Sequence, residues 1–246
     1  MGVRGVLCGA VNLQAIAQVP SLLKHDAELG DAEAQLVLSG VYFRGDGVPQ
    51  DYSKALYWAR KAAEQEYVVG QVALGIFYDE GVGVPRDPEL AVYWLRKAAE
   101  QGHVDAQNNL GSMLVSGEGV SKDAKQAVYW FRKAAEQGHA RAQSNLGTAY
   151  YRGNGVPENF KKALIWSRKA AEQGHAEAQA LTGILYLRDE RAPENSKKAY
   201  AWLSVSVASG DNKAKELRDI AAESLSPSEL REGQALAAEY FEKYSD

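Results

Sequence analysis

Small and apolar residues recur along this chain at the spacing of one helical face. In the segment 142–150 they stand at the first position and at the positions four, five and eight residues later, which is the pattern of an amphipathic helix. The same segment returns every 36 residues. One row of it is formed by Leu38, Leu74, Leu110 and Leu146, with Thr182 in the fifth copy. The pattern predicts the first helix of a repeated unit.

The tryptophans give the period of the repeat. All five lie 36 residues apart, at Trp58, Trp94, Trp130, Trp166 and Trp202, and residues 30–209 divide into five such units without a gap. Each tryptophan stands in a second alanine-rich helix, for example 127–137. A buried tryptophan covers roughly 150–250 Å², so we expect each one to be the main apolar anchor of its unit.

Glycine marks the turns and the helix ends. Four units carry Gly-x-Gly-Val after the first helix, three of them followed by proline, as in the segment 153–157. Two glycines supply backbone conformations that other residues avoid, and proline cannot continue a helix. Gly102, Gly138 and Gly174 stand where a left-handed cap would end the second helix. A glycine also recurs inside the first helix, as at Gly147, and predicts close approach of a neighbouring helix.

The ends of the chain read as caps, which an open stack of repeats needs. Residues 18–29 are expected to form an N-terminal cap helix, and residues 210–246 two C-terminal capping helices. The last of these begins with an N-cap and capping box at Ser226 and Glu229 and extends to about residue 243. Three of its residues are expected to cover the stack: Leu236, Tyr240 and Phe241. Residues 1–17 read either as a weak signal peptide or as a further helix.

Composition excludes several classes of protein. The formal net charge is −4 with 24% charged residues, so there is no basic excess for nucleic acid or an anionic membrane. No apolar run reaches the roughly 18 residues of a membrane helix. Cys8 is the only cysteine, so an intrachain disulfide and a cysteine-based zinc site cannot form. We expect a soluble chain, cytoplasmic or, if residues 1–17 are a signal, periplasmic or exported.

These motifs resemble the Sel1-like repeat family, which is related to the tetratricopeptide repeats. The fourth unit carries Ala-Arg-Ala-Gln at 140–143, Leu-Gly at 146–147, Gly-Val-Pro at 155–157 and Lys-Ala-Ala-Glu-Gln-Gly-His at 169–175. The fifth unit departs, because the segment 189–193 lacks both turn glycines. The resemblance implies an all-α fold, an α/α superhelix (solenoid) of five 36-residue helix-turn-helix repeats with helical caps at both ends. It also implies that the first helices line a concave face.

Other motifs have simpler explanations than chemistry. His103, His139 and His175 share one repeat position, but helices stacked roughly 8–10 Å apart cannot share a zinc ion that needs ligands at roughly 2 Å. We expect turn residues there, no metal and no cofactor. The glycine turns follow helices rather than strands, so they are not phosphate loops. Ser21 and Lys24 match the S-x-x-K motif of penicillin-binding enzymes, but the companion motifs are absent, and we expect no enzyme.

The family's groove-facing slots can be carried onto the third and fourth units. They predict partner-binding residues on one side of the first helices, to which the bordering asparagines are added: Asn108, Asn109, Ser112, Arg141, Ser144, Asn145, Thr148, Tyr151 and Arg152. Tyrosine and arginine are enriched at binding hot spots, and asparagine can pair with a peptide backbone. In the first two units the slots are apolar, at Leu36, Phe43, Val72 and Ile76, with one acid at Asp79. The asparagines could equally hold neighbouring units together.

The sequence therefore predicts a non-catalytic adaptor or scaffold that binds another protein or peptide in the concave groove. One alternative is an immunity protein that neutralises a secreted bacterial toxin, as some members of the family do. A second is a serine hydrolase or penicillin-binding activity using Ser21 and Lys24. Neither nucleic acid nor membrane insertion is expected, and the outer side and the ends leave room for a homodimer.

Overall fold

The computed structural model describes residues 21–188 and 193–244. All regular structure in these ranges is helical, and within each of the two units described below successive repeat helices pack against one another as an all-α solenoid. The chain divides into two compact units, residues 1–123 and 124–246, and each is described by itself. The predictions for residues 1–17 and for the fifth turn at 189–192 lie outside the described residues.

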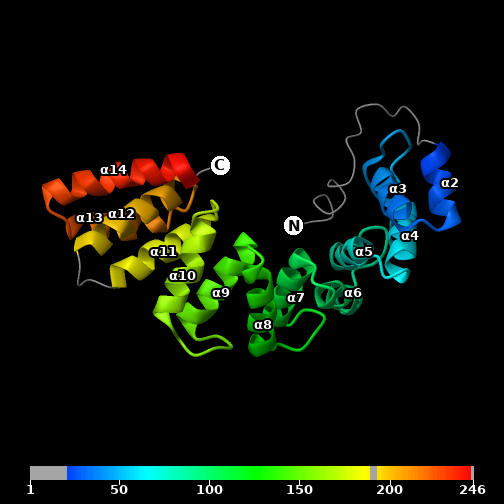
Figure 1. Cartoon of the computed structure of the whole chain (residues 1–246), viewed down its shortest axis with the longest axis horizontal. Helices are drawn as coiled ribbons and strands as arrows, with labels where there is room; N and C mark the ends of the chain where they lie inside the picture. Colours follow the sequence, from blue (N-terminus) through cyan, green and yellow to red (C-terminus); the bar gives the residue numbers. More distant parts are fainter. Residues whose placement is uncertain (1–20, 189–192, 245–246) are drawn as a thin grey trace. The chain divides into compact units, whose positions relative to one another are not determined.

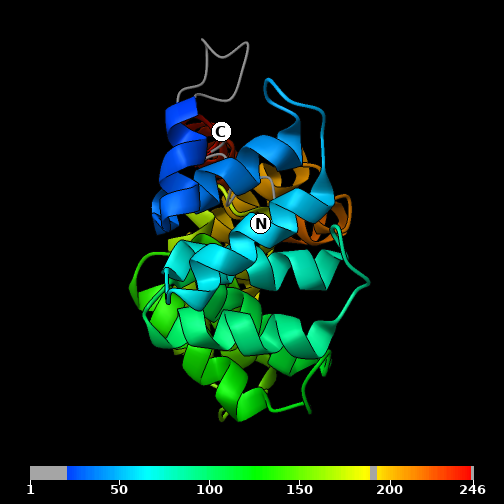
Figure 2. The same cartoon turned by 90° about the vertical axis from the view of Figure 1, so that its right-hand side faces the viewer.

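The first unit contains the N-terminal cap helix and the helices of two and a half repeats (Figures 1 and 2). The cap is α2 (Ser21–Leu29), as predicted, and it packs on the first repeat helix. The helices that follow are α3 (Ala32–Arg44), α4 (Tyr52–Glu64), α5 (Val68–Glu80), α6 (Pro88–Glu100) and α7 (Val104–Ser116).

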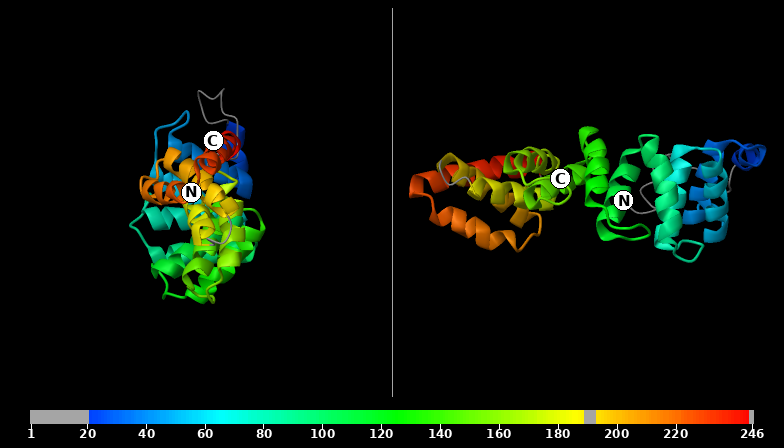
Figure 3. Two further views of the ribbon diagram at one scale, coloured as in Figure 1. Left: turned by 90° about the vertical axis from the view of Figure 1, so that its left-hand side faces the viewer. Right: turned by 90° about the horizontal axis from the view of Figure 1, so that it is seen from below.

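The second unit ends in a helical cap. It comprises α8 (Ala124–Glu136), α9 (Ala140–Arg152), α10 (Phe160–Ala171), α11 (Ala176–Arg188), α12 (Pro193–Ala208), α13 (Ala214–Glu223) and α14 (Pro227–Tyr244). Helix α12 contacts α11, α13 and α14, and Figure 3 shows α13 and α14, in orange and red, beside it. The capping box is confirmed, since Glu229 accepts from the Ser226 amide at 2.9 Å and Ser226 accepts from the Glu229 amide at 3.4 Å.

The turn glycines adopt the predicted left-handed conformation, and the second glycine of the last three pairs also makes a tight contact. Gly119 and Gly155 have φ of 67° and 75°. A Cβ atom on either would lie 2.1 Å from a backbone oxygen at the start of the preceding second helix, that of Pro88 or Ala124. Each turn therefore presses against the helix start of the repeat before it, and only glycine fits there.

The core is built from leucine and alanine more than from tryptophan. The four leucines of the 36-residue row are fully buried, as are the alanine pairs near the ends of the second helices. Trp130 and Trp202 are buried, at 7% and 2% exposure, but Trp58, Trp94 and Trp166 are only half-buried. The prediction of a buried tryptophan anchor in every unit was thus wrong for three of them. An alanine-rich neighbour does not reach far enough to cover a whole indole ring.

Small residues bring the helices of one repeat together. A Cβ atom on Gly75 would stand 2.8 Å from the Leu95 side chain, and one on Gly147 would stand 3.0 Å from the Ser167 backbone nitrogen. Ser39, which replaces this glycine in the first unit, donates to the Ala55 carbonyl at 2.7 Å. The predicted close approach of the two helices is confirmed at these positions.

A buried glutamine joins consecutive repeats, and the sequence pattern did not reveal it. Gln143 is 4% exposed, and its amide donates to the carbonyl of Ala135 in the preceding second helix at 3.1 Å. Its oxygen accepts from the amide of Gln173, thirty residues later, at 2.8 Å. The pairs Gln65–Gln35 and Gln101–Gln71 repeat that spacing at 2.8 and 2.9 Å. Each such pair satisfies a polar group that burial would otherwise leave without a partner.

The C-terminal cap covers the last repeat through two tyrosines, Tyr240, which was predicted, and Tyr244, which was not. Trp202 is covered by the rings of Tyr240 and Tyr244, whose centroids lie 4.5 and 5.4 Å from its own. Burial beside Trp202 raises the pKa of Tyr240 to about 12. Leu236 is half-buried, whereas Phe241 is 49% exposed. The expectation that Phe241 covers the stack was wrong, because it lies one residue away from the face that carries both tyrosines.

Candidate protein-binding surface

A row of polar side chains runs along the solvent side of α9. Arg141, Asn145, Thr148 and Arg152 stand at intervals of four, three and four residues, so they form a single line along the helix. The arginines at the two ends are exposed, and the two residues between them are half-buried. Within the described ranges, no acidic side chain forms an ion pair with either arginine. We call these four residues the α9 row.

Tyr151 lies beside the α9 row in an aromatic cluster. Its ring is 5.9 Å from that of Phe160 at the start of α10, and the Arg188 guanidinium lies 6.0 Å from the Tyr151 ring and 4.2 Å from the Phe160 ring. Cation–π contacts of this kind hold an arginine in place while one of its faces stays accessible. Tyr151 therefore supports part of the surface besides being half-exposed itself.

Two of the predicted contact residues are buried and cannot reach a partner. Asn108 and Ser144, which occupy the same repeat position, are 2% and 5% exposed. They directly follow the glutamines that point into the preceding repeat, so they share that buried side of the helix. The accessible face is thus turned by about one residue from the predicted one, toward Asn109 and Asn145.

The equivalent row on α7 is polar but carries less charge. Asn109 is half-buried and takes a 3.4 Å hydrogen bond from the Asn108 amide, which fits the alternative reading of the asparagine as a packing residue. Ser112 is exposed, yet its hydroxyl donates back to the Asn108 carbonyl at 3.1 Å. Such a bond within one helix leaves the serine's oxygen able to accept from another molecule.

The apolar slots of the first two repeats do not form an open groove. Leu36, Val72 and Ile76 are at most 5% exposed, and the ring of Phe43 packs 5.5 Å from that of Tyr52. The polar slot Asp79 pairs with Arg86 at 3.2 Å. The expected apolar face at this end was wrong, since these side chains are used within the unit, as the hydrophobic effect favours.

Two of the three repeated histidines act as helix caps. The Nδ1 atoms of His103 and His139 accept from the backbone amides of Ala106 and Ala142 at 3.4 and 3.1 Å, so they satisfy a donor at the first turn of α7 and α9. Burial lowers the pKa of His103 and of His175, which favours the neutral ring. The buried Nδ1 atom of His175 has no hydrogen-bond partner among the described residues and lies 3.2 Å from a Glu177 oxygen. In the described part of the chain, no three metal-binding side chains are grouped as a metal site would require.

The S-x-x-K match is not assembled as a catalytic pair. Ser21 is exposed, and Lys24 pairs with Glu28 at 3.6 Å instead. Both residues stand on the solvent side of α2, where no base is directed at the hydroxyl of Ser21 in the described structure. A nucleophilic serine needs such a base within hydrogen-bond reach.

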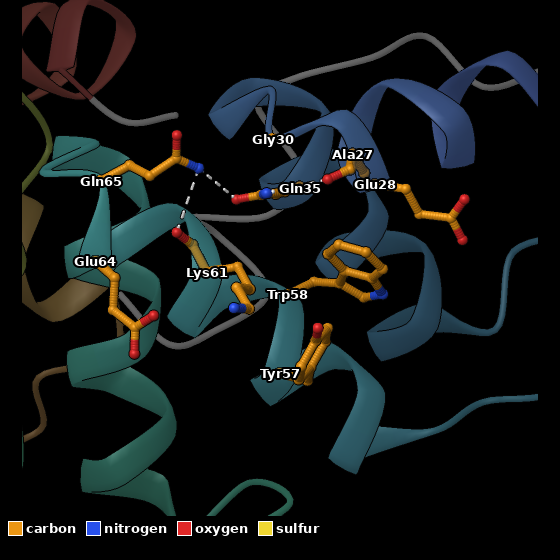
Figure 4. Close-up of a pocket in the computed structure, with 9 residues that line it drawn as sticks. All are labelled: Ala27, Glu28, Gly30, Gln35, Tyr57, Trp58, Lys61, Glu64 and Gln65. Atoms are coloured by element: carbon orange, nitrogen blue, oxygen red, sulfur yellow. Dashed lines mark hydrogen bonds between the residues drawn. The ribbon is translucent and has the colours of Figure 1, made fainter.

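Sequence reasoning also missed a cavity of about 430 Å³ between α2 and α4. Ala27, Glu28 and Gly30 line one side, and Tyr57, Trp58 and Lys61 line the other (Figure 4). The remaining lining residues are Gln35, Glu64 and Gln65. The hydrogen-bonded pair of Gln35 and Gln65 lies at one edge of it, and the rings of Tyr57 and Trp58 meet edge to face with centroids 5.0 Å apart. We call this space the Trp58 cavity.

Comparison with known proteins identifies the family. The Sel1 repeat family model matches five consecutive segments, residues 32–67, 68–103, 104–139, 140–175 and 176–211. This chain belongs to the Sel1 repeat family. Among solved structures, a Sel1 repeat protein from Oxalobacter formigenes is similar, with a TM-score of 0.75 and 31% identity over 89% of this chain and 92% of that one. Among curated proteins, none matches the chain significantly.

Two further solved structures show weaker similarity. One is a protective antigen of uropathogenic Escherichia coli, 26% identical, with a TM-score of 0.42 over 91% of this chain and 71% of that one. The other is an immunity protein from Pseudomonas aeruginosa, 19% identical, with a TM-score of 0.44 over 98% of this chain and 86% of that one. Similarity at this level does not identify a partner for this chain, and toxin neutralisation stays a prediction. None of the helices in the described ranges is long and apolar enough to cross a membrane.

Proposed function

We propose that this Sel1 repeat chain is a non-catalytic interaction module that binds a partner protein or peptide along its first helices, with the α9 row as the principal contact. Sel1 repeat proteins are typically modules of this kind. The observation that carries the proposal is the α9 row itself. Two exposed arginines without an acidic partner in the described residues flank two half-buried polar residues along one helix.

The chemistry of the α9 row favours a segment with carboxylates or exposed backbone carbonyls. Arginine offers five donors in a planar fork that matches carboxylate geometry, and Asn145 can both donate to and accept from a peptide backbone. Eleven residues of helix separate the two arginines, which is about 16 Å at 1.5 Å per residue. A partner segment of about five extended residues covers that distance.

Site-specific photocrosslinking tests this surface. A photoreactive residue at position 148 should crosslink to a protein partner in cells of the native organism, whereas one at position 125, on the outer helix α8, should not. With the captured partner purified, the double variant Arg141→Ala/Arg152→Ala should weaken binding at least about tenfold, the effect of losing a hot-spot contact. Its melting temperature should stay within about 2 °C, because exposed substitutions cost little stability.

A matched control removes two cations from the outer helices of the same unit. Lys125→Ala/Lys161→Ala changes the net charge equally, at two exposed positions, and should leave the partner's affinity unchanged. Equal loss of affinity in both double variants would show a general charge effect. A parallel loss of affinity and melting temperature in the arginine variant would show a structural role. Either result contradicts the proposal.

A further inference from the structure

The Trp58 cavity has an internal counterpart four repeats later. Adding 144 to the residue numbers carries Ala27, Gly30, Gln35 and Trp58 onto Ala171, Gly174, Gln179 and Trp202. The polar framework is also the same. Gln35 donates to the Ala27 carbonyl at 3.0 Å and Gln179 to the Ala171 carbonyl at 3.5 Å. The same framework recurs in repeats between these two, where Gln107 and Gln143 donate to the carbonyls of Ala99 and Ala135. The first and fifth repeats can therefore be compared position by position.

In the fifth repeat this site is filled by the last turn of α14. The rings of Tyr240 and Tyr244 lie 4.5 and 5.4 Å from that of Trp202. The backbone carbonyl of Tyr244 accepts from Gln179 at 3.4 Å and stands 3.4 Å from where a Cβ atom of Gly174 would be. The two aromatic rings, four residues apart in α14, therefore cover the indole of Trp202. The carbonyl at the end of the helix accepts a hydrogen bond from the glutamine.

Around Trp58 the described helices supply no such cover. Trp202 is 2% exposed, whereas Trp58 is half-buried and borders about 430 Å³ of open space. Helix α2 packs on α3, and at the tryptophan register it offers Leu22, which is itself 67% exposed. An indole face next to a cavity of this size loses the contacts that a ring packed on it would supply.

The charges around the cavity define the occupant further. In the fifth repeat the Lys243 ammonium lies 5.1 Å from the centroid of the Tyr244 ring, and Tyr244 is the main cause of the raised pKa of Lys243, with smaller contributions from Glu239 and Glu172. Glu28 is the counterpart of Glu172. The rim at Lys61 and Glu64 is charged, where the fifth repeat has Val205 and Ala208. An occupant here should therefore present aromatic rings to Trp58, with its charged groups near Glu28, Lys61 and Glu64 at the rim.

We propose that the Trp58 cavity is a docking site for the C-terminal turn of a partner protein's helix, with aromatic residues at positions i and i+4. This is the pattern of Tyr240 and Tyr244 in α14. The site lies in the first unit, apart from the α9 row, and does not depend on the function proposed for that row. Aromatic anchors in pockets of this kind carry much of the energy of an interface.

The chain's own sequence provides the probe. A peptide of residues 226–244, amidated at its C-terminus and held helical by a lactam between exposed positions 234 and 238, should bind the full chain saturably in a fluorescence anisotropy titration. Trp58→Ala should weaken this binding at least about tenfold, as expected for loss of an aromatic anchor. Trp94→Ala, at the same register but away from the cavity, should leave it unchanged. A peptide with alanine at positions 240 and 244 should not bind.

A charge reversal at the rim of the cavity provides a second test, in a variant whose folding should be unaffected. Glu28 is more than half exposed, so Glu28→Lys should fold normally and weaken binding at least about threefold by repelling the peptide's lysine. Its counterpart Glu136→Lys, exposed on α8, should have no effect. Two results overturn the proposal. One is the absence of saturable binding, and the other is binding that persists in Trp58→Ala, which would mean that the peptide displaces α14 from Trp202.

Discussion

The side-chain amide of Gln173 donates to the side-chain oxygen of Gln143 at 2.8 Å, and Gln143 in turn donates to a carbonyl near the end of α8. The two glutamines thus connect the two helices of one repeat to the second helix of the repeat before it. The carbonyl of Ala135 lies near the end of its helix, where it accepts from the Gly138 amide at 3.1 Å. Gln143 adds a second donor from a neighbouring helix.

Replacing Gln143 should therefore cost more than its size suggests. Gln143→Met keeps the volume but leaves the Ala135 carbonyl and the Gln173 amide without this partner, so the free energy of unfolding should fall by about 1–3 kcal/mol. Urea denaturation measures it. In a double-mutant cycle with Gln173→Met, the two effects should be coupled by about 0.5–1.5 kcal/mol. Simple additivity of the two effects would show that the bond between the two amides contributes nothing.

Substitutions of two glycines allow the cost of a steric clash to be separated from the cost of a left-handed backbone conformation. Gly155 and Gly138 have φ of 75° and 93°, but a Cβ atom would meet the Ala124 backbone at 2.1 Å only at Gly155, with nothing within 4 Å at Gly138. Gly138→Ala should cost about 1–2 kcal/mol for the left-handed conformation alone. Gly155→Ala should cost at least about 2 kcal/mol more, because backbone atoms must move. Equal midpoints in thermal unfolding would contradict the contact.

Glu66 occupies the position at which other repeats have glycine. Its φ is 62°, whereas Gly102 and Gly138 occupy that position with φ of 95° and 93°. The left-handed conformation costs an L-residue about 1–2 kcal/mol, and glycine avoids this cost. Glycine also loses more conformational entropy on folding, which offsets part of that gain. Glu66→Gly should therefore raise stability by about 0.5–1 kcal/mol in chemical denaturation. Glu66→Ala serves as the control, and an equal gain there would assign the effect to the carboxylate instead.

His103 should make stability depend on pH. Burial lowers the pKa of His103 below its ordinary value of 6.5, with the charge of Asp105 opposing the shift. The unfolded state then binds the proton more tightly, so stability is full above about pH 6.5 and falls as the pH drops below it. Asparagine caps a helix without titrating, and His103→Asn should reduce the slope of melting temperature against pH between about 7 and 5. The exposed His25, changed to Asn, should not.

The period, the turns and both caps could be predicted because they depend on local backbone conformation. Gly-x-Gly-Val requires left-handed residues wherever it stands, and Ser226 with Glu229 is a complete cap within four residues. The burial of Trp58 and the accessibility of Ser144 could not be predicted in this way, because they depend on which side chains of the adjacent helix pack against them. Ala27 and Glu28 leave Trp58 partly open, while Gln143 draws its neighbour Ser144 into the packed side of α9.

The glutamine pairs were open to prediction, although the amphipathic pattern hid them. A glutamine inside a helix reads as a surface residue. Its recurrence between two alanines at Gln35, Gln71, Gln107, Gln143 and Gln179 is the available signal, since a solvent-facing site has no need for one residue type at every period. The Trp58 cavity has a weaker signal: Leu22 replaces tryptophan in the cap helix, and this change alone does not specify a space.

The glutamine pairs also bear on how chains of this kind lengthen and shorten. Donor and acceptor of each pair lie in the same repeat, and the outgoing bonds of Gln35, Gln107, Gln143 and Gln179 reach the alanine eight residues earlier. If a whole 36-residue segment such as 68–103 were lost, Gln71 and Gln101 would leave together and Gln107 would meet Ala63 in place of Ala99. Duplication or loss of single repeats can therefore occur in evolution without orphaning an amide, whereas a deletion that removes only one glutamine of a pair would leave the other behind.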